Sequence, residues 1–471
     1  MAPSTELSSQ HSSALYRFVW RWHFYAGLLV APFLIILAVT GGLYLYAQEI
    51  EGVWYGDLIR VKSTPTLIAP SKQEAAVLAA YPGAQITRYV APPTTDRAAE
   101  WSLRTRGGEA RTVFVDPGDG RITGSIRTDT RLKLVLSGLH GELLLGRTGD
   151  TLVELAGCWA FVLLVTGVFL WWPRRGRSAG TFVPRLSAKG RSFWRDLHAV
   201  PSLWNLPVIA FLILTGLPWS GMWGKSLASL GTLSAVSGAL APTPNFIEAP
   251  GVGIHADHAT PTLENNPDAQ AAPWAVRHAP LPSGTAAHAR IGIDQLTAEA
   301  EAREIHRAGL SVIYPSGPGG VFTLSFVPDI AQGQRTVHVD PADGRILQDI
   351  GWREYSPLGK AVELGVETHM GRQFGAANRL VMLASCLLIV LTLTFATVSW
   401  WSRRPKGSFG APPVPDRFKA GALVVIVACA MGILFPLVGV SMVLIYAADR
   451  VLMRAAPRLH AVNRAGASKM P

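Results

Sequence analysis

Four stretches of the chain are apolar over a length that can cross a bilayer. They are Phe24–Tyr46, Leu152–Trp172, Val200–Trp219 and Leu380–Trp401. A spanning helix needs about 20 mostly apolar residues, and tyrosine or tryptophan rings, which favour the headgroup level, stand at many of the ends. The pattern predicts a multi-pass α-helical membrane protein with transmembrane helices over residues 18–48, 150–172, 198–220 and 377–401.

A fifth apolar segment, residues 420–450, contains Pro436 and allows two interpretations. A single helix would carry the arginines that follow it to the side opposite the other basic loops, against the positive-inside rule. A hairpin bent near Phe435–Pro436 returns them, although each arm is then short for a full span. These arginines are Arg450, Arg454 and Arg458. We favour the hairpin, with residues 451–471 as a tail.

The two long polar segments each predict a small α+β module. In residues 49–149, a helix over Ser71–Ala80, opened by a cap at Ser71, precedes strands at Gln85–Val90, Glu100–Arg104, Arg111–Val115 and Arg121–Ile126. In residues 291–376, a helix at Asp294–Arg307 precedes strands at Leu310–Tyr314, Val321–Phe326, Arg335–Val339 and Arg345–Leu347. Residues 221–290 form a linker or insertion, because Ser229–His288 is rich in alanine, proline and glycine.

The second half of the chain repeats the first. Residues 111–122 read RTVFVDPGDGRI, and residues 335–346 read RTVHVDPADGRI, each with a tight turn between strands. His23 is followed 17 and 18 residues later by Thr40-Gly41, as His198 is by Thr215-Gly216. His140 and His369 share the spacings to Gly146 and Gly375, and to the Trp-Trp pairs. A tandem duplication in the same topology predicts halves related by an axis along the membrane normal.

Charge gives the orientation. The net charge is +11, and the basic residues gather before the first helix and in the loops 173–197 and 402–419. These segments, with the N-terminus at residues 1–17, are therefore expected in the cytoplasm. The protein is then expected in a bacterial inner (cytoplasmic) membrane, with both modules on the periplasmic side. Because the positive-inside rule accounts for the excess of basic residues, a nucleic-acid partner is not expected.

Four of the twelve histidines occur in both halves. His23 and His198 begin the first and third helices at the inner face, and His140 and His369 precede the second and fourth at the outer face. Opposed neutral imidazoles between helices suit bis-histidine ligation of b-type haem, so we predict two haems. The small residues Gly27, Gly41, Gly167 and Gly216 could leave room for the rings. A lone interface histidine is often only an anchor, and zinc prefers further ligands.

Other residues have two possible roles. Arg17, Arg21 and Arg195 near the inner pair, and Arg372 and Arg147 near the outer pair, could neutralise haem propionates or serve only as topology signals. Cys158 and Cys386 fall one position out of register in the repeat and are interpreted as packing residues. Glu154, an acid within a span, is a possible functional group.

The helix–module–helix plan, the Asp-Pro-X-Asp-Gly-Arg-Ile turns, Leu139-His140-Gly141 with Gly146, and Trp-Trp before Arg resemble the PepSY-associated transmembrane family. The resemblance runs from about Leu15 to Arg454. It implies an iron-regulated inner-membrane protein, and some members are described as haem-containing reductases of iron(III)-siderophores at the periplasmic side.

Two functions from different classes follow. In the first, the chain is an oxidoreductase that carries electrons through two haems b to a periplasmic ferric siderophore. It has no GxGxxG or P-loop, so the electrons come from a separate donor, a quinol or a cytoplasmic reductase. In the second, the modules bind a peptide or protein and modulate a peptidase, which leaves the paired histidines unexplained. A transporter is less favoured because the clear spans carry almost no charge.

Overall fold

The computed structural model describes residues 3–63, 66–173, 180–226, 263, 272–277, 281–285, 291–306, 308–317, 319–404, 422–445 and 447. Most of the predicted linker, most of the loop 402–419 and the tail 451–471 lie outside these residues. So do Arg450, Arg454 and Arg458.

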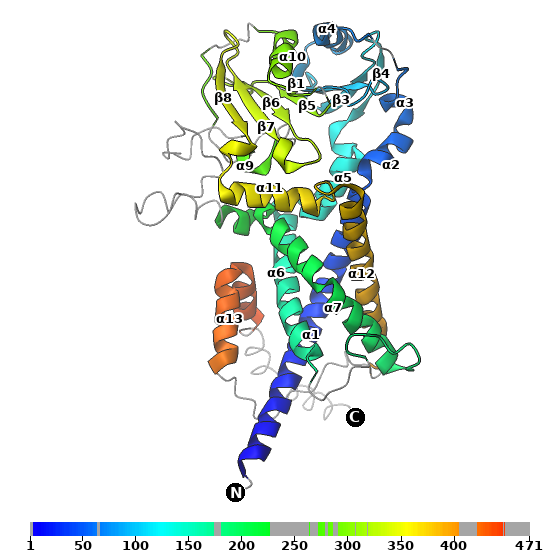
Figure 1. Ribbon diagram of the computed structural model, residues 1–471, viewed down its shortest axis with the longest axis vertical. Coiled ribbons are helices and arrows are strands. Elements are labelled where there is room, and N and C mark those ends of the chain that lie inside the picture. The colour runs from blue at the N-terminus through cyan, green and yellow to red at the C-terminus, as the bar shows by residue number, and fades with distance from the viewer. Residues whose placement is uncertain are drawn as a thin grey trace, which may run out of the picture.

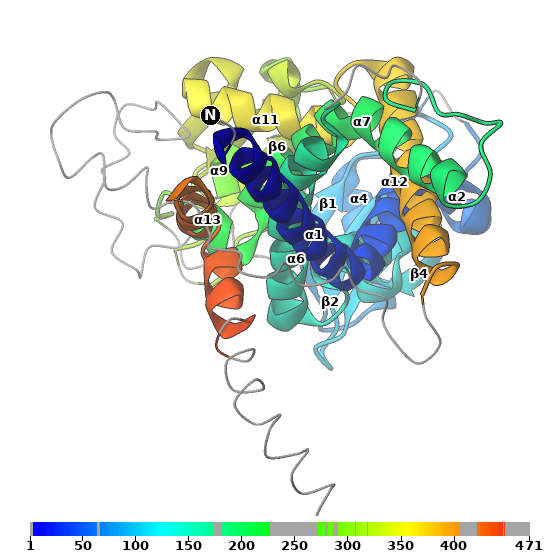
Figure 2. The same ribbon diagram turned by 90° about the horizontal axis from the view of Figure 1, so that it is seen from below.

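Four helices are long and apolar enough to cross a membrane, and they form a bundle (Figures 1 and 2). They are α1 (Pro3–Tyr44), α6 (Gly146–Trp171), α7 (Arg191–Gly216) and α12 (Gly375–Trp401). α1 packs against α6 and α12, and α7 packs against α12 and α6. Large apolar side chains such as Leu29, Leu380 and Leu387 are exposed on the bundle, which suits helices that face lipid chains. The chain is therefore a multi-pass membrane protein.

The fifth apolar segment consists of two short helices, α13 (Ala422–Leu434) and Pro436–Ile445. Each is too short to span a bilayer alone. Gly432 and Gly439 lie against each other, since a Cβ built on Gly432 would stand 3.2 Å from the Gly439 Cα. The bend is anchored by Phe435, which is buried among residues of α1 and α6.

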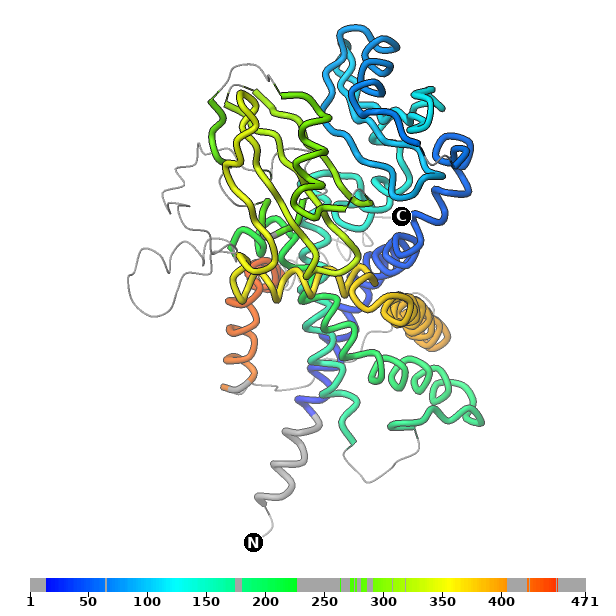
Figure 3. The backbone as a smooth tube through the Cα atoms, turned by 45° about the horizontal axis from the view of Figure 1, so that its top comes forward, coloured from blue at the N-terminus to red at the C-terminus, as the bar shows by residue number. Residues whose placement is uncertain are grey.

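One eight-stranded antiparallel sheet lies beyond one end of the bundle (Figures 1 and 3). Its order is β4-β3-β2-β1-β5-β6-β7-β8, so the strands of the two predicted modules join through the pairing of β1 with β5. The strands are β1 (Gln85–Val90), β2 (Ala99–Arg104), β3 (Ala110–Val115), β4 (Ile122–Arg127), β5 (Leu310–Ile313), β6 (Phe322–Phe326), β7 (Arg335–Val339) and β8 (Ile346–Gly351). Counted outward from the centre of the sheet, both halves therefore place their four strands in chain order, β1 to β4 on one side and β5 to β8 on the other.

Two helices cover the sheet on the side away from the bundle, α4 (Pro70–Ala80) and α10 (Ile293–Ala302) (Figure 1). The predicted cap at Ser71 is wrong: α4 starts at Pro70, whose fixed φ suits the first helical turn. Ser71 instead donates its backbone N–H and hydroxyl to Asp294 at the start of α10. α10 also ends earlier than expected, at Ala302.

Short helices connect the sheet to the bundle. They are α2 (Ala47–Trp54), α3 (Gly56–Ile59), α5 (Leu132–Glu142), α9 (Trp274–Arg277) and α11 (Pro357–His369), with single 3-10 turns at Thr128–Thr130, Leu217–Trp219, Ala331–Gly333 and Trp352–Glu354. α5 packs against α1 and α6, and α11 packs against α7. These contacts place α5 and α11 at equivalent positions at the sheet end of the bundle.

An ion network fixes α5 to the sheet. Arg131, at the start of α5, contacts Glu51 of α2 at 3.0 Å and Glu100 of β2 at 2.6 Å. The Glu51 side chain is 3% exposed and that of Arg131 is 15% exposed. Although burial acts to raise the pKa of Glu100, the charge and hydrogen bonds of Arg131 hold that pKa below its ordinary value.

Arg131→Met should destabilise the protein by about 3–5 kcal/mol, because it leaves two carboxylates in a buried site without their cation. Thermal unfolding in detergent measures the loss. The wild-type contribution of Glu100 is present at neutral pH and is lost as the pH falls below the carboxylate range, through the depressed pKa of the folded state. Equal melting temperatures for the variant and the wild type would contradict this role.

Candidate functional site

A single cavity of about 2680 Å³ runs through the bundle to the underside of the sheet, and all four repeated histidines line it. His23 lies on α1 and His198 on α7, toward the end far from the sheet; we call them the inner pair. His140 lies on α5 and His369 on α11, next to the sheet, and we call them the outer pair.

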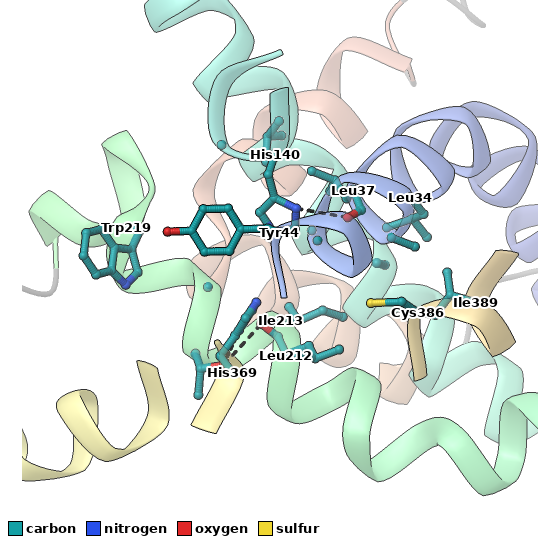
Figure 4. A pocket seen from close by; sticks show the side chains of 18 of the residues that line it. Leu34, Leu37, Tyr44, His140, Leu212, Ile213, Trp219, His369, Cys386 and Ile389 are labelled. Carbon is teal, nitrogen blue, oxygen red and sulfur yellow. Dashed lines mark hydrogen bonds between the residues drawn. The ribbon is translucent and has the colours of Figure 1, made fainter. Parts of the chain in front are cut away.

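The two rings of the outer pair lie opposite each other across the cavity (Figure 4). The ring centroids of His140 and His369 are 6.3 Å apart, and the ring planes are at 88°. Burial lowers the pKa of both imidazoles, and that of His369 falls to about 3, with the nearby His140 ring adding to the effect. Both rings are therefore neutral at physiological pH, as metal-binding imidazoles must be.

Matching threonines fix the outer rings. Thr215 of α7 donates its hydroxyl to the Phe211 carbonyl at 2.7 Å, and its oxygen lies 2.8 Å from His369 Nδ1. Thr40 of α1 donates in the same way to Ile36 and lies 3.2 Å from His140 Nδ1. Because each hydroxyl proton is already used, each threonine oxygen accepts a hydrogen bond from the imidazole.

The inner rings are held in a similar way by the neighbouring spans. His23 Nδ1 lies 2.8 Å from the Thr166 hydroxyl of α6, which donates its own proton to Val162. His198 Nδ1 lies 3.0 Å from the backbone carbonyl of Thr392 on α12. His23 and His198 both line the cavity.

All four imidazoles therefore carry their proton on Nδ1. A carbonyl oxygen accepts but cannot donate, which settles the tautomer of His198, and also of His140, whose Nδ1 is 3.0 Å from the Leu37 carbonyl. Among the described residues, none forms a hydrogen bond with Nε2 of these rings. Each Nε2 consequently keeps a lone pair on a ring whose other nitrogen is anchored, the arrangement typical of histidine ligands.

Glycines give the rings their space. A Cβ on Gly41 would lie 3.0 Å from His140 Cε1, closer than side chains tolerate without displacement. Cβ atoms at Gly167 and Gly216 would contact His23 and His369 at 3.5 and 3.8 Å, while one at Gly27 would meet nothing within 4 Å and would face the open cavity. The four glycines singled out in the sequence thus border the cavity.

The predicted arginines lie in different surroundings. Arg195 and Arg372 line the cavity, but Arg195 pairs with Asp196 at 2.5 Å and Arg372 pairs with Glu367 at 2.7 Å. Arg147 also lines the cavity, whereas Arg17 and Arg21 are not among the described residues that do. Arg21 instead lies over the Tyr25 ring, 5.0 Å from its centroid.

Glu154 has a structural partner. Its carboxylate accepts the backbone N–H groups of Met222 and Trp223 at 2.8 and 3.0 Å, in the helical turn that follows α7. These hydrogen bonds satisfy a buried charge that would otherwise be costly in a span. Cys158 is buried in the apolar cluster between α1 and α6, and Cys386 borders the cavity near Gly41.

The arrangement can hold one metal ion between two imidazoles. Metal–imidazole bonds of about 2 Å, with each ring centroid slightly more than 1 Å beyond its Nε2, require centroids about 6 Å apart, close to the 6.3 Å of the outer pair. Among the described residues, no cluster of three or more histidine, cysteine, aspartate or glutamate side chains could hold a metal ion. A four-ligand zinc site is therefore not found in the described part of the chain.

The family model described as the PepSY-associated TM region matches the sequence over residues 20–403, the main part of the chain. The chain belongs to the PepSY-associated transmembrane family. The matched range contains all four cavity histidines, both halves of the sheet, α6, α7 and α12, and α1 from Trp20 onward. No curated protein matches the chain, so the family assignment rests on this match.

The helices that carry the outer pair, α5 and α11, were not predicted from the sequence. It placed His140 and His369 simply before the second and fourth spans, whereas both lie in the last turn of separate helices, α5 and α11. The apolar positions of residues 132–142 and 357–369 follow a helical period, which was the available signal. The sequence also marked Thr40 and Thr215 only as part of a repeat and did not assign them to the rings.

Proposed function

We propose that this member of the PepSY-associated transmembrane family is a haem b-containing oxidoreductase of the bacterial inner membrane. It moves electrons from the cytoplasmic side to a ferric chelate, such as a ferric siderophore, in the periplasm. The tandem duplication supplies the two halves of each histidine pair, and the sheet lies on the periplasmic side. The observation that carries the proposal is the outer pair, opposed at 6.3 Å with both Nδ1 atoms already engaged.

The residues present fit a haem at each pair. Neutral imidazoles with a free Nε2 are good axial ligands, and the apolar helices of a bundle suit the macrocycle. His23, His198, His140 and His369 would be the axial ligands. When bound, haem iron supplies reversible one-electron transfer between its ferric and ferrous states.

The chain itself orients and spaces the two centres. Seventeen residues of α1 separate His23 from Thr40, the anchor of His140, which is about 25 Å at 1.5 Å per residue. Three threonine hydroxyls and one backbone carbonyl, that of Thr392, hold the four imidazoles with the proton on Nδ1. Between the two pairs the cavity is lined mostly by apolar side chains, such as Leu34, Leu206 and Ile389.

Substrate and donor would meet opposite ends of the cavity. At the sheet end the cavity is lined by polar residues of the sheet, including Arg88, Ser102 and Thr112, where an external chelate could approach the outer pair. One electron converts one chelated iron(III) to iron(II), which the chelator holds less tightly. The donor is a separate quinol or cytoplasmic reductase.

Anaerobic mixing of the reduced protein with a ferric trihydroxamate chelate tests the proposal. The purified chain is reduced with dithionite, freed of excess reductant and mixed with the chelate beside a coloured iron(II) trap. We expect the ferrous haem band to disappear and two iron(II) ions to appear per chain.

The gallium(III) chelate of the same ligand is the control, since it has the same shape but accepts no electron. It should leave the haem reduced. A colourless protein that binds the chelate or a peptide would instead support the alternative PepSY role in binding and regulation, and the redox proposal would fail.

Thr215→Val should weaken the outer site without removing a ligand. The valine has the same shape but accepts no hydrogen bond from His369 Nδ1, and loss of such a partner typically costs about 10–100-fold in metal affinity. Haem transfer from the purified protein to excess apomyoglobin measures the change, and Thr215→Ser should restore slow release.

Thr394→Val is the matched control for this experiment. The Thr394 hydroxyl donates only to Val390 of its own helix and is exposed, so haem release should stay at the wild-type rate. Equal release rates for the Thr215 and Thr394 variants would show that the threonine does not support the ligand.

A further inference from the structure

Two arginines converge on one tryptophan at the inner end of the cavity. The guanidinium carbons of Arg191 and Arg403 lie 5.8 and 5.5 Å from the ring centroid of Trp20. Arg191 begins α7, Arg403 follows the end of α12, and Trp20 lies on α1. All three line the cavity that contains His23 and His198.

Helix geometry directs this cluster toward the inner pair. Trp20 precedes His23 by three residues on α1, and Arg191 precedes His198 by seven on α7. Both spacings keep the residues on one helix face. At 1.5 Å per residue they lie about 4 and 10 Å nearer the inner end than the histidines. The cluster therefore lies on the inner side of a planar group centred between His23 and His198.

The cluster has positive charge but no partner of opposite charge in the described part of the chain. Arg403 Nε is buried and has no hydrogen-bond partner. Burial and the neighbouring charge of Arg191 lower the pKa of Arg403. Other basic residues at this end differ, since Arg185 and Arg195 both pair with Asp196.

We propose that Trp20, Arg191 and Arg403 form a binding site for the carboxylate groups of the porphyrin held by the inner histidine pair. This inference rests on the proposed function and differs from the expectation drawn for Arg17, Arg21 and Arg195. Two guanidiniums that repel each other beside an aromatic face are suited to oxyanions, which they bind with charge-assisted hydrogen bonds. A lipid phosphate shares this chemistry and is the competing source.

The test uses full-length protein with His369→Ala, so that only the inner haem contributes. In this background Arg191→Gln with Arg403→Gln should speed haem transfer to apomyoglobin at least about tenfold, the effect of losing hydrogen bonds to a charged group. The midpoint potential of the inner haem should also fall, because the two arginines favour the ferrous state by their positive charge and the variant removes that charge. Arg191→Lys with Arg403→Lys should restore most of the potential, since the charge remains.

Arg404→Gln is the matched control. Arg404 adjoins Arg403 in sequence but stacks on Trp401 at 3.6 Å and is not among the described residues that line the cavity, so its loss should change neither readout. Unchanged haem release and potential in the double glutamine variant, with loss of co-purified phospholipid phosphate, would assign the site to lipid and overturn the inference. A protein without any haem would instead overturn the proposed function.

Discussion

His369→Ala should reduce the haem content of the purified protein from two haems per chain to one. The substitution removes one of the two imidazoles that face each other at 6.3 Å in the outer pair. With His140 alone, the outer site would keep only one of its two imidazoles, and we expect it to lose its haem during purification. Haem content per chain, determined as the pyridine complex, measures the result.

Two further variants sharpen this prediction. His306→Ala is the control, because His306 is exposed and does not line the cavity; it should keep both haems. His369→Met should keep the outer haem but raise its midpoint potential, because methionine–histidine ligation favours the ferrous form. Two haems with unchanged potentials in both His369 variants would remove this residue from the site.

His23→Ala should stop electron flow across the membrane while leaving the outer pair intact. His23 and His198 are the only histidines near that end among the described residues that line the cavity, and the outer pair alone would not bridge the thickness of the bundle. Proteoliposomes with ferricyanide inside and dithionite outside report this flow, because either orientation of the protein conducts. Bleaching of ferricyanide should fall from the wild-type rate to that of protein-free vesicles.

The outer haem provides the internal control for this second prediction. In His23→Ala, the remaining haem should still be reoxidised by external ferric chelate as fast as in the wild type, so loss of transmembrane flow would not reflect misfolding. His306→Ala should conduct normally. A His23→Ala variant that bleaches ferricyanide at the wild-type rate would show that electrons cross by another route.

The sheet was largely predictable from the sequence. All eight strands start and end within a few residues of the expected positions, because the alternating pattern and the Asp-Pro-X-Asp-Gly turns are local signals. In these turns Asp116 and Asp340 accept the N–H of the residue two positions on, at 2.9 and 2.8 Å, and Gly120 and Gly344 have positive φ. The joining of β1 to β5 depends on contacts distant in sequence, so no local pattern revealed it.

The candidate site was predictable only in part. Repetition marked the four histidines and the Thr-Gly pairs, and all of them border the cavity or its rings. The sequence could not show which nitrogen of each ring is engaged, because the acceptors come from other helices. For the same reason it could not show that Arg195, a possible propionate contact, pairs with Asp196, and it did not single out Arg191 and Arg403.

Electron paramagnetic resonance of the oxidised, purified protein tests the central claim most directly, because it reports the axial ligands of ferric haem. The account predicts two low-spin ferric haems per chain, each with two imidazole ligands. The outer signal should be strongly anisotropic, as expected for ligand planes at 88°. A spectrum without haem, or one with only high-spin iron, would contradict the account.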